Sequence, residues 1–216
     1  MMDAAPVLEA RDLAVGHGKR RVGQGLGFAM ARGEVLCLLG PNGSGKTTLF
    51  KTLLGLLPPL AGEVRVLGEP VAAWSRSAFA RHVGYVPQAH AGIFPFTVED
   101  VVLMGRAARI GRFAQPSSHD RAFALHSLQP LGVAHLHQRI YTAISGGERQ
   151  LVALAGVLAR DPLIMLFDEP TSQLDLANRN RFRDVLAALP QQAIVVTHDL
   201  DLVADFDRVL VVEDGR

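Results

Sequence analysis

The chain has 216 residues, of which 49% are hydrophobic and 20% are charged. This length and apolar content are enough for a large core in one compact domain. The formal net charge of +1 excludes a global field that would recruit nucleic acid or an anionic membrane. The single cysteine, Cys37, excludes a disulfide within the chain and is typical of a protein in a reducing compartment.

Neither a membrane span nor a signal peptide is expected. No apolar run approaches the roughly 20 residues that a membrane-spanning helix needs. The opening residues Met1–Pro6 contain neither the basic region nor the apolar stretch of a signal peptide. We therefore expect a cytoplasmic protein. If it acts at a membrane, a partner has to hold it there.

The first part of the chain predicts a small antiparallel sheet. Val7–Val15 mix apolar and charged residues in the manner of an exposed edge strand. A Gly-rich, basic segment at residues 16–27 follows, and then a short strand at Phe28–Met30. Gly62–Gly68 alternates apolar and polar residues, as a strand with one solvated face does.

A phosphate-binding motif lies between these strands. Glu34–Leu39 predicts a buried strand before it, and the spacing over Thr48–Leu57 predicts a helix after it. Glycines there let backbone N–H groups turn toward a polyphosphate, and the helix start adds partial positive charge. Lys46 is expected to reach the β and γ phosphates, and Thr47 to hold Mg²⁺ through its hydroxyl. A chance Gly-rich turn would not require the flanking strand and helix. The pattern G-x-x-x-x-G-K-[ST], followed directly by Thr48, is matched by Gly40, Pro41, Asn42, Gly43, Ser44, Gly45, Lys46 and Thr47.

The middle of the chain predicts helices. A short helix at Ser77–His82 and a core strand at Val83–Pro87 lead to Gln88. Thr97 then caps a helix, with Asp100 three residues further on. Residues 106–116 are basic and irregular, and helices are expected over 120–131 and 134–138. Residues from about 89 to 160 show no strand pattern and are interpreted as an inserted helical subdomain.

A second candidate anion site begins the next helix. Ser145-Gly146-Gly147-Glu148 forms a capping box, with Ser145 as the cap and Glu148 at the third helical position. A capped helix with no ligand is the simpler alternative, but it does not explain two consecutive glycines, which cost backbone entropy. Exposed N–H groups at a helix start bind anions, so we favour a functional site.

Two later strands end in residues that suit catalysis. Leu163–Phe167 is an apolar run followed by Asp168 and Glu169, and Ala193–Thr197 is followed by His198. Ligands bind at the carboxyl ends of strands in open α/β sheets. Asp168 suits a role near Mg²⁺, and Glu169 then stands where a water could attack the γ phosphate. Solvated acids at a strand end and a structural histidine are the alternatives.

Taken together, these motifs are similar to those of the ATP-hydrolysing subunit of ATP-binding cassette (ABC) transporters, along essentially the whole chain. Six motifs occur in the family's order, which makes the resemblance very specific. They are the Walker A loop Gly40–Thr47, the Q-loop Gln88, the signature Ile144–Glu148, Walker B Leu163–Glu169, the D-loop Ser172–Asp175 and the switch His198. The resemblance implies an α/β fold, a phosphate-loop NTPase core with a mostly parallel sheet, a small antiparallel β subdomain and a helical subdomain. The core and β subdomain would be residues 1–88 and 161–216, and the helical subdomain residues 89–160.

The resemblance also implies a mechanism that needs two chains. ATP would lie between the Walker A loop of one cassette and Ser145, Gly146, Gly147 and Glu148 of a second copy. Thr47, Gln88 and Asp168 would organise Mg²⁺ and water. Glu169 would polarise the attacking water, assisted by Lys46, Gln88 and His198. Hydrolysis would reset the dimer.

The pattern of Val86–Gln88 followed by Pro95–Arg106 looks like that of importers for iron-siderophores, haem and cobalamin, and some molybdate importers share it. The resemblance then implies integral-membrane permease subunits, docked near Phe94, Phe96 and the helix from Thr97, and indirectly a solute-binding protein. The chain would lie peripherally on the cytoplasmic face of the membrane, with no nucleic acid partner. Where these importers place an aromatic residue against adenine, this chain has His17. The importers continue past the position of Arg216, so a further strand and helix are expected there.

Other classes remain as alternatives. An exporter subunit or an importer of the energy-coupling-factor type is the nearest. Soluble ABC proteins of DNA repair carry a long coiled coil that this chain lacks. ABC translation factors carry two cassettes, and a small-molecule kinase would need no Ser145-Gly146-Gly147 element.

Overall fold

The computed structural model describes residues 5–41, 43–87, 95–110, 114–189, 192–197 and 200–213, together with Gly215. The chain divides into two compact units, residues 1–79 with 190–216, and residues 80–189. The expected division into core and helical subdomains stays a prediction. Within the described part of the chain, every helix is too short or too polar to cross a bilayer.

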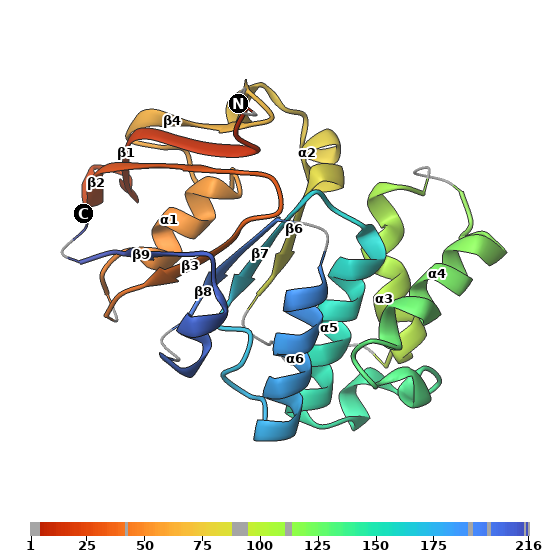
Figure 1. Ribbon diagram of the computed structural model, residues 1–216. Coiled ribbons are helices and arrows are strands. Elements are labelled where there is room, and N and C mark those ends of the chain that lie inside the picture. Colours follow the sequence, from red (N-terminus) through yellow and green to blue (C-terminus); the bar gives the residue numbers. More distant parts are fainter. Residues whose placement is uncertain are drawn as a thin grey trace. The chain divides into compact units, whose positions relative to one another are not determined.

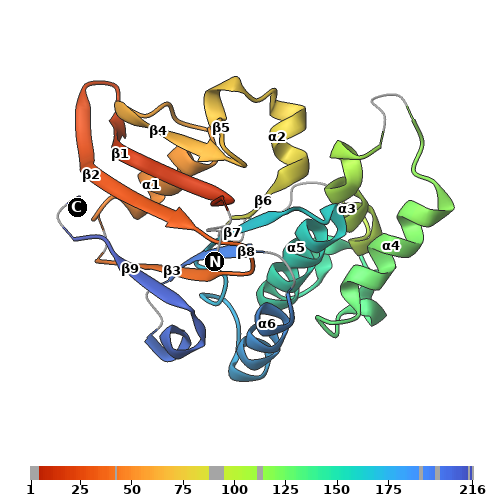
Figure 2. The ribbon, with the colours of Figure 1, turned by 45° about the horizontal axis from the view of Figure 1, so that its top comes forward.

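The first unit contains the expected antiparallel sheet (Figure 2). Its strands lie in the order β2-β1-β4-β5. Their bounds are Leu8–His17 for β1, Arg20–Met30 for β2, Ala61–Val66 for β4 and Glu69–Pro70 for β5. The short helix η1 (Val71–Ala73) follows β5.

The expectation of an edge position for the first strand is wrong, because β1 pairs with β2 on one side and β4 on the other. Its mixed pattern has another cause. The register shifts between Ala10 and Leu13, and Asp12 has a positive φ of 43°. A β-bulge changes the parity of the buried positions, so alternation in the sequence breaks although the strand is central.

The Gly-rich, basic segment is also a strand, since β2 extends over it from Arg20 to Met30. Its pairing with β1 uses backbone groups, which glycines provide as well as other residues. Gly23 lies opposite Val15, and a Cβ at Gly23 would be 3.1 Å from Cγ2 of that valine. Glycine therefore fits the crowded side of the strand and does not mark a loop.

A parallel set of strands carries the phosphate loop in the same unit. The central strand β3 (Val35–Leu39) pairs in parallel with β8 (Gln192–Val196) and with β9 (Arg208–Val211). Cys37 on β3 is fully buried, and burial raises the pKa of its thiol to about 11. The short helix η5 (Leu200–Asp205) precedes β9.

The helix after the phosphate loop, α1 (Lys46–Leu53), is shorter than the expected Thr48–Leu57 (Figure 1). Its inward face includes Leu49 and Leu53, which are buried. Gly55 adopts a left-handed φ of 65°, which ends the helix. Leu56, which falls inside the expected helix but after the observed one, is consequently 52% exposed.

The second unit combines a strand pair with helices. Helix α2 (Arg76–His82) leads into β6 (Val83–Val86), which pairs in parallel with β7 (Ile164–Asp168). The mainly parallel core strands and the antiparallel sheet confirm the predicted α/β fold class. The helical elements that follow β6 are α3 (Val98–Gly105), η2 (Arg106–Ala108), α4 (Ser118–Leu128), η3 (Ala134–Leu136), η4 (Tyr141–Ala143), α5 (Gly146–Arg160) and α6 (Leu176–Ala188).

Local side-chain chemistry starts three of these helices. Thr97, Ser117 and Ser145 each form a full capping box with the residue three positions on. Each box satisfies two backbone N–H groups that the helix itself cannot pair. The boxes at Thr97 and Ser145 confirm two sequence predictions.

Helices α3 and α5 contact through their backbones. An ideal Cβ placed on Gly105 of α3 would lie 1.9 Å from the carbonyl oxygen of Gly156 of α5. No side chain fits at that distance, so Gly105 sets how closely the two helices pack. At Gly156 the nearest atom to a Cβ is the Val101 carbonyl oxygen at 3.8 Å, an ordinary contact.

These two glycines provide a matched pair of substitutions. Gly105→Ala should destabilise the protein by about 1–3 kcal/mol, because it forces two packed backbones apart. Gly156→Ala should be neutral, or stabilising by up to ~1 kcal/mol, since alanine is the better helix former. Urea unfolding of both variants checks this. A Gly105→Ala protein as stable as the parent would contradict the packing described.

Candidate functional site

The phosphate loop connects β3 to α1 in a shape that only glycine allows. Gly43 and Gly45 have positive φ values of 84° and 101°. A Cβ on Gly40, whose φ is 155°, would lie 2.2 Å from the Val212 carbonyl oxygen, whereas one on Gly43 would meet open space. The loop therefore lies against the residue that follows β9 at one end, and no described residue crowds its tip at Gly43.

Lys46 folds back over this loop. Its Nζ donates hydrogen bonds to the carbonyl oxygens of Gly40 at 2.6 Å and Pro41 at 2.8 Å, and the residue is 8% exposed. An ammonium group held by two carbonyl oxygens keeps one further N–H to donate. The lysine is thus placed at the loop before any anion arrives.

Two hydroxyl groups of the loop fit a nucleotide with its metal ion. Ser44 Oγ is buried and has no hydrogen-bond partner within the described structure. A buried hydroxyl without a partner is costly, and a phosphate oxygen would satisfy it. Thr47 is exposed at the start of α1, as the predicted Mg²⁺ ligand needs to be. The residues present therefore fit ATP and Mg²⁺.

His17, the predicted adenine neighbour, lies at the end of β1. It is exposed, and its Nε2 is 3.3 Å from Oγ1 of Thr48, which is buried in α1. This contact places the imidazole beside the helix that follows the phosphate loop. His17 and Thr48 are thus brought together with the loop in one unit.

The predicted anion site at Ser145 has the expected local geometry. Ser145 accepts a hydrogen bond from the Glu148 N–H at 3.2 Å, and its own N–H donates to Glu148 Oε2 at 2.7 Å. Hydrogen bonds from Ser145, and then the nearby charges of His135 and Arg139, hold the pKa of Glu148 below its ordinary value. The ionised Glu148 carboxylate therefore serves as the acceptor for the Ser145 N–H in the capping box.

The structure supplies a packing reason for the two glycines. A Cβ on Gly146 would be 3.1 Å from Oε1 of Gln173, and one on Gly147 would be 3.3 Å from the Gln173 carbonyl oxygen. The segment before α6 therefore lies against the start of α5. The anion-site interpretation of the glycine pair is not required by its backbone and stays a prediction.

Asp168 and Glu169 follow the buried residues of β7, as predicted. Glu169 has a φ of 52°, a left-handed conformation that costs a non-glycine residue about 1–3 kcal/mol. Its carbonyl oxygen accepts hydrogen bonds from the Ser172 hydroxyl at 2.9 Å and the Ser172 N–H at 3.3 Å. The strained turn is thus held by the residues that follow it.

Tyr85 is a site residue that the sequence did not reveal. In the β6–β7 register Tyr85 lies opposite Leu166, on the face that Asp168 shares two residues later. Burial, followed by the charge of Asp168 and a hydrogen bond to it, raises the pKa of Tyr85 to about 12. Its hydroxyl therefore stays protonated and donates to Asp168. The sequence does not show that β6 and β7 are neighbours, so it could not reveal the contact between Tyr85 and Asp168.

Three predicted site residues, Asn42, Gln88 and His198, lie outside the described residues, as does Phe94 of the predicted docking surface. Their roles stay predictions. Phe96 lies within the described part and is 43% exposed.

Phe96 borders a groove of about 690 Å³ in the second unit. The groove is lined mainly by apolar side chains of α3 and of the segment after it, and Met104 on its wall is 48% exposed. Arg121 supplies a charge at this groove and pairs with Glu99 at 3.2 Å. The residues that line it include Phe96, Leu103, Met104, Ala107, Ile110 and Arg121.

Comparison with known proteins agrees with these motifs. A family described as "ABC transporter" matches residues 24–172 of this chain. A protein of Haemophilus influenzae described as an ABC transporter ATP-binding protein is 42% identical over 196 residues, covering 89% of this chain and 74% of its own.

A protein of Nocardia farcinica described as "Hemin import ATP-binding protein HmuV" is 41% identical over 223 residues, covering 97% of this chain and 75% of its own. Among solved structures, one described as a metal-chelate type ABC transporter in an inward-facing conformation superimposes with a TM-score of 0.84 at 33% identity. It covers 98% of this chain and 81% of that chain.

The cap of α5 can be tested by two substitutions at one position. Ser145→Ala should lower the free energy of unfolding by about 1 kcal/mol, because the Glu148 N–H loses its acceptor. Ser145→Asp should remain within about 0.5 kcal/mol of the parent, since its carboxylate accepts the same bond near a positive helix end. Urea unfolding measures both. Equal losses in the two variants would show that the cap does not act as described.

Proposed function

Because this chain belongs to the ABC transporter family, we propose that it is the ATP-hydrolysing subunit of a binding-protein-dependent importer. The solute would be a metal chelate of the iron-siderophore, haem or cobalamin type, or molybdate. The observation that carries the ATPase assignment is the phosphate loop, where Lys46 is held by two carbonyl oxygens and the buried Ser44 hydroxyl has no partner in the part of the chain that the structure describes. The importer assignment is supported by the similarity to the hemin import protein and to the metal-chelate type transporter.

The nucleotide would be bound mainly by the first unit. When bound, ATP would supply the reactive phosphoanhydride, and Mg²⁺ would offset part of the negative charge of its phosphates. Lys46 and the N–H groups of the loop hold the β and γ phosphates, and Ser44 gains the acceptor that it lacks. Thr47 holds the metal ion through its hydroxyl. His17, fixed by its contact with Thr48, provides a flat ring for adenine.

The second unit would supply the groups that act on water. Glu169 would accept a proton from the attacking water, and hydrogen bonds from Ser172 hold the strained turn in which it lies. Asp168 helps to hold Mg²⁺, and the hydrogen bond from Tyr85 orients its carboxylate. We assign Gln88 to the coordination of metal and water and His198 to contact with the γ phosphate.

A second copy of the chain would complete each site. Ser145 is exposed, and Gly146 and Gly147 are half-buried, at the positive end of α5. This end can receive a γ phosphate that is bound to the loop of the other copy. Glu148, already engaged by Ser145, holds the cap in shape. One cassette alone would then bind ATP but hydrolyse it slowly.

We assign the groove at Phe96 to an integral-membrane permease, which would hold this chain on the cytoplasmic face of the membrane. The exposed fractions of Phe96 and Met104, 43% and 48%, are large for apolar side chains that line one groove. An apolar surface with a charged residue beside it suits the end of a partner helix. The solute-binding protein would act on the permease and not on this chain.

An exporter subunit or an energy-coupling-factor importer is the competing assignment. Purification of the chain with its membrane partner distinguishes them, because a binding-protein-dependent permease moves solute inward only when its binding protein is added. Vesicles reconstituted with the complex should take up the solute in an ATP-dependent manner. Outward transport, or transport without a binding protein, would contradict the importer assignment.

Glu169→Gln should abolish most turnover while leaving ATP binding intact. A positioned general base contributes about 10²–10⁴-fold to the rate, and the amide cannot accept the proton. Release of phosphate from ATP, and sedimentation of the ATP-bound dimer, measure the two effects. Glu69→Gln, which changes an exposed glutamate of β5, should hydrolyse ATP at the parent rate. Turnover of Glu169→Gln within threefold of the parent would remove this residue from its role.

Phe96→Asp should abolish assembly with the permease, because it places a charge in an apolar contact surface. The isolated chain should still fold and bind ATP, since the side chain is already 43% exposed. Copurification with the permease and ATP binding are measured on the same preparation. Leu56→Asp charges another exposed apolar side chain, one that does not line the groove, and should assemble normally. A Phe96→Asp chain that still supports transport would place the docking surface elsewhere.

A further inference from the structure

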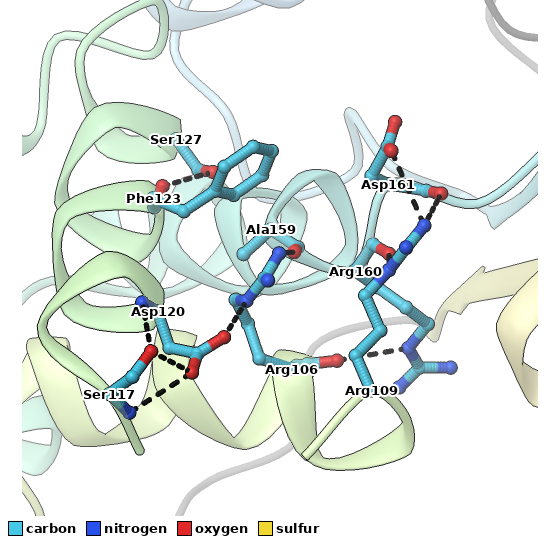
Figure 3. A network of polar contacts seen from close by, with 10 residues as sticks. Arg106, Arg109, Ser117, Asp120, Phe123, Ser127, Ala159, Arg160 and Asp161 are labelled. Carbon is cyan, nitrogen blue, oxygen red and sulfur yellow. Dashed lines mark hydrogen bonds and ion pairs between the residues drawn. The ribbon is translucent and has the colours of Figure 1, made fainter.

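The C-terminal end of α5 is held by arginines from the segment that follows α3 (Figure 3). Arg106 Nη1 donates to the Ala159 carbonyl oxygen at 3.0 Å. Arg109 donates from Nε to the Arg160 carbonyl oxygen at 2.6 Å and from Nη2 to the Asp161 carbonyl oxygen at 2.7 Å. These carbonyls belong to the last turn, where a helix leaves four acceptors unpaired. Positive charge is favourable there as well.

A hydrogen bond also runs in the opposite direction, from α5 to α3. Arg160 Nε donates to the carbonyl oxygen of Gly105, the last residue of α3, at 3.3 Å. Gly105 is also the residue whose missing Cβ lets α3 contact the α5 backbone. The end of α3 and the end of α5 are therefore joined by backbone packing and by hydrogen bonds in both directions.

Arg106 is itself fixed. Its side chain is 9% exposed, pairs with Asp120 at 2.8 Å and lies 4.6 Å from the centroid of the Phe123 ring. Hydrogen bonds from Ser117, and then from Arg106, lower the pKa of Asp120 to about 2, so the pair is charged at neutral pH. A buried charge with this many partners does not change position easily.

The same short segment also lines the groove. The Arg109 N–H donates to the Arg106 carbonyl oxygen at 2.7 Å, a 3₁₀-type turn in which side chains three residues apart point the same way. Arg106 and Arg109 form one such pair, directed at α5. Ala107 and Ile110 form the next pair and line the groove. One turn of chain thus presents one face to the groove and another to the helix that starts at Ser145.

We propose that residues 106–110 are a connector through which occupancy of the groove and engagement of the α5 N-terminus influence each other, with Arg109 as its positioning residue. This inference rests on the proposed docking and dimerisation. A 15-residue helix is about 22 Å long and stiff. A displacement of its C-terminal end, which Arg106 and Arg109 hold, would therefore also displace Ser145 at its N-terminal end. Coupling of this kind is reciprocal, so ATP-driven dimerisation must also change the groove.

Reciprocity permits a test without the permease. Met104→Cys, in a Glu169→Gln parent, places an environment-sensitive fluorophore in the groove, while the native Cys37 is fully buried and should not be labelled. We expect addition of ATP and Mg²⁺ to change the fluorescence of the parent as it dimerises. Arg109→Ala should reduce that change at least threefold while sedimentation shows the same ATP-dependent dimer. Arg109→Lys should be intermediate, because its single amine cannot reproduce the fork of donors.

Arg121→Ala is the matched control. Arg121 lines the same groove but pairs with Glu99 of α3, so its removal should leave the fluorescence change intact. A change of parent size in Arg109→Ala would overturn the connector, as would a parent that dimerises with no change in fluorescence. An equal loss in Arg121→Ala would also overturn it, because the effect would then not depend on α5. A parent that binds ATP but never dimerises would instead contradict the proposed function.

Discussion

The second unit depends on the hydrogen bonds that satisfy the backbone groups at the two ends of α5. A helix has a partial positive charge at its N-terminus and a partial negative charge at its C-terminus. In α5 the negative end is neutralised by Arg106 and Arg109, which bind the last carbonyls. At the positive end Ser145 and Glu148 pair two N–H groups, and Gly146 and Gly147 add no side chains. The helix is held by arginines at one end and capped by Ser145 at the other, where we propose that it receives a phosphate.

Close backbone contacts give this helix its place. Gly105 allows α3 to touch α5, and the pair of glycines at the α5 start allows Gln173 to touch it from the segment before α6. Contacts of backbone with backbone have little freedom to adjust, because no flexible side chain lies between them. The second unit is therefore stiff where the proposed docking groove and the Ser145 site are joined.

The phosphate loop and the end of β7 each contain a feature that lowers the stability of the fold. Glu169 adopts a left-handed conformation, and Ser44 buries a hydroxyl that has no partner among the described residues. Both features are unfavourable for folding alone. A nucleotide would satisfy the hydroxyl, and the strained turn places the backbone of Glu169, the residue that we propose as the general base. Strain at these two places is what a phosphate-loop enzyme of this family leads one to expect.

Much of the site was predictable from the sequence because its elements are local. The phosphate loop is a strand, a Gly-rich turn and a helix in consecutive residues, and the caps at Thr97 and Ser145 involve residues three positions apart. The buried run before Asp168 likewise needs no distant partner. Such patterns depend on backbone geometry within a few residues, so one sequence contains them completely.

Tertiary structure decided the features that depend on distant residues. The central position of β1 follows from pairing with β2 and β4, and the bulge near Asp12 hides it from the alternation pattern. The hydrogen bond from Tyr85 to Asp168 exists because β6 and β7 are neighbours although about 80 residues separate them. The hydrogen bond from Arg109 to the Asp161 carbonyl oxygen likewise joins residues that are far apart in the chain. Sequence spacing cannot reveal such pairs, because the interaction depends on which elements pack together and not on their order in the chain.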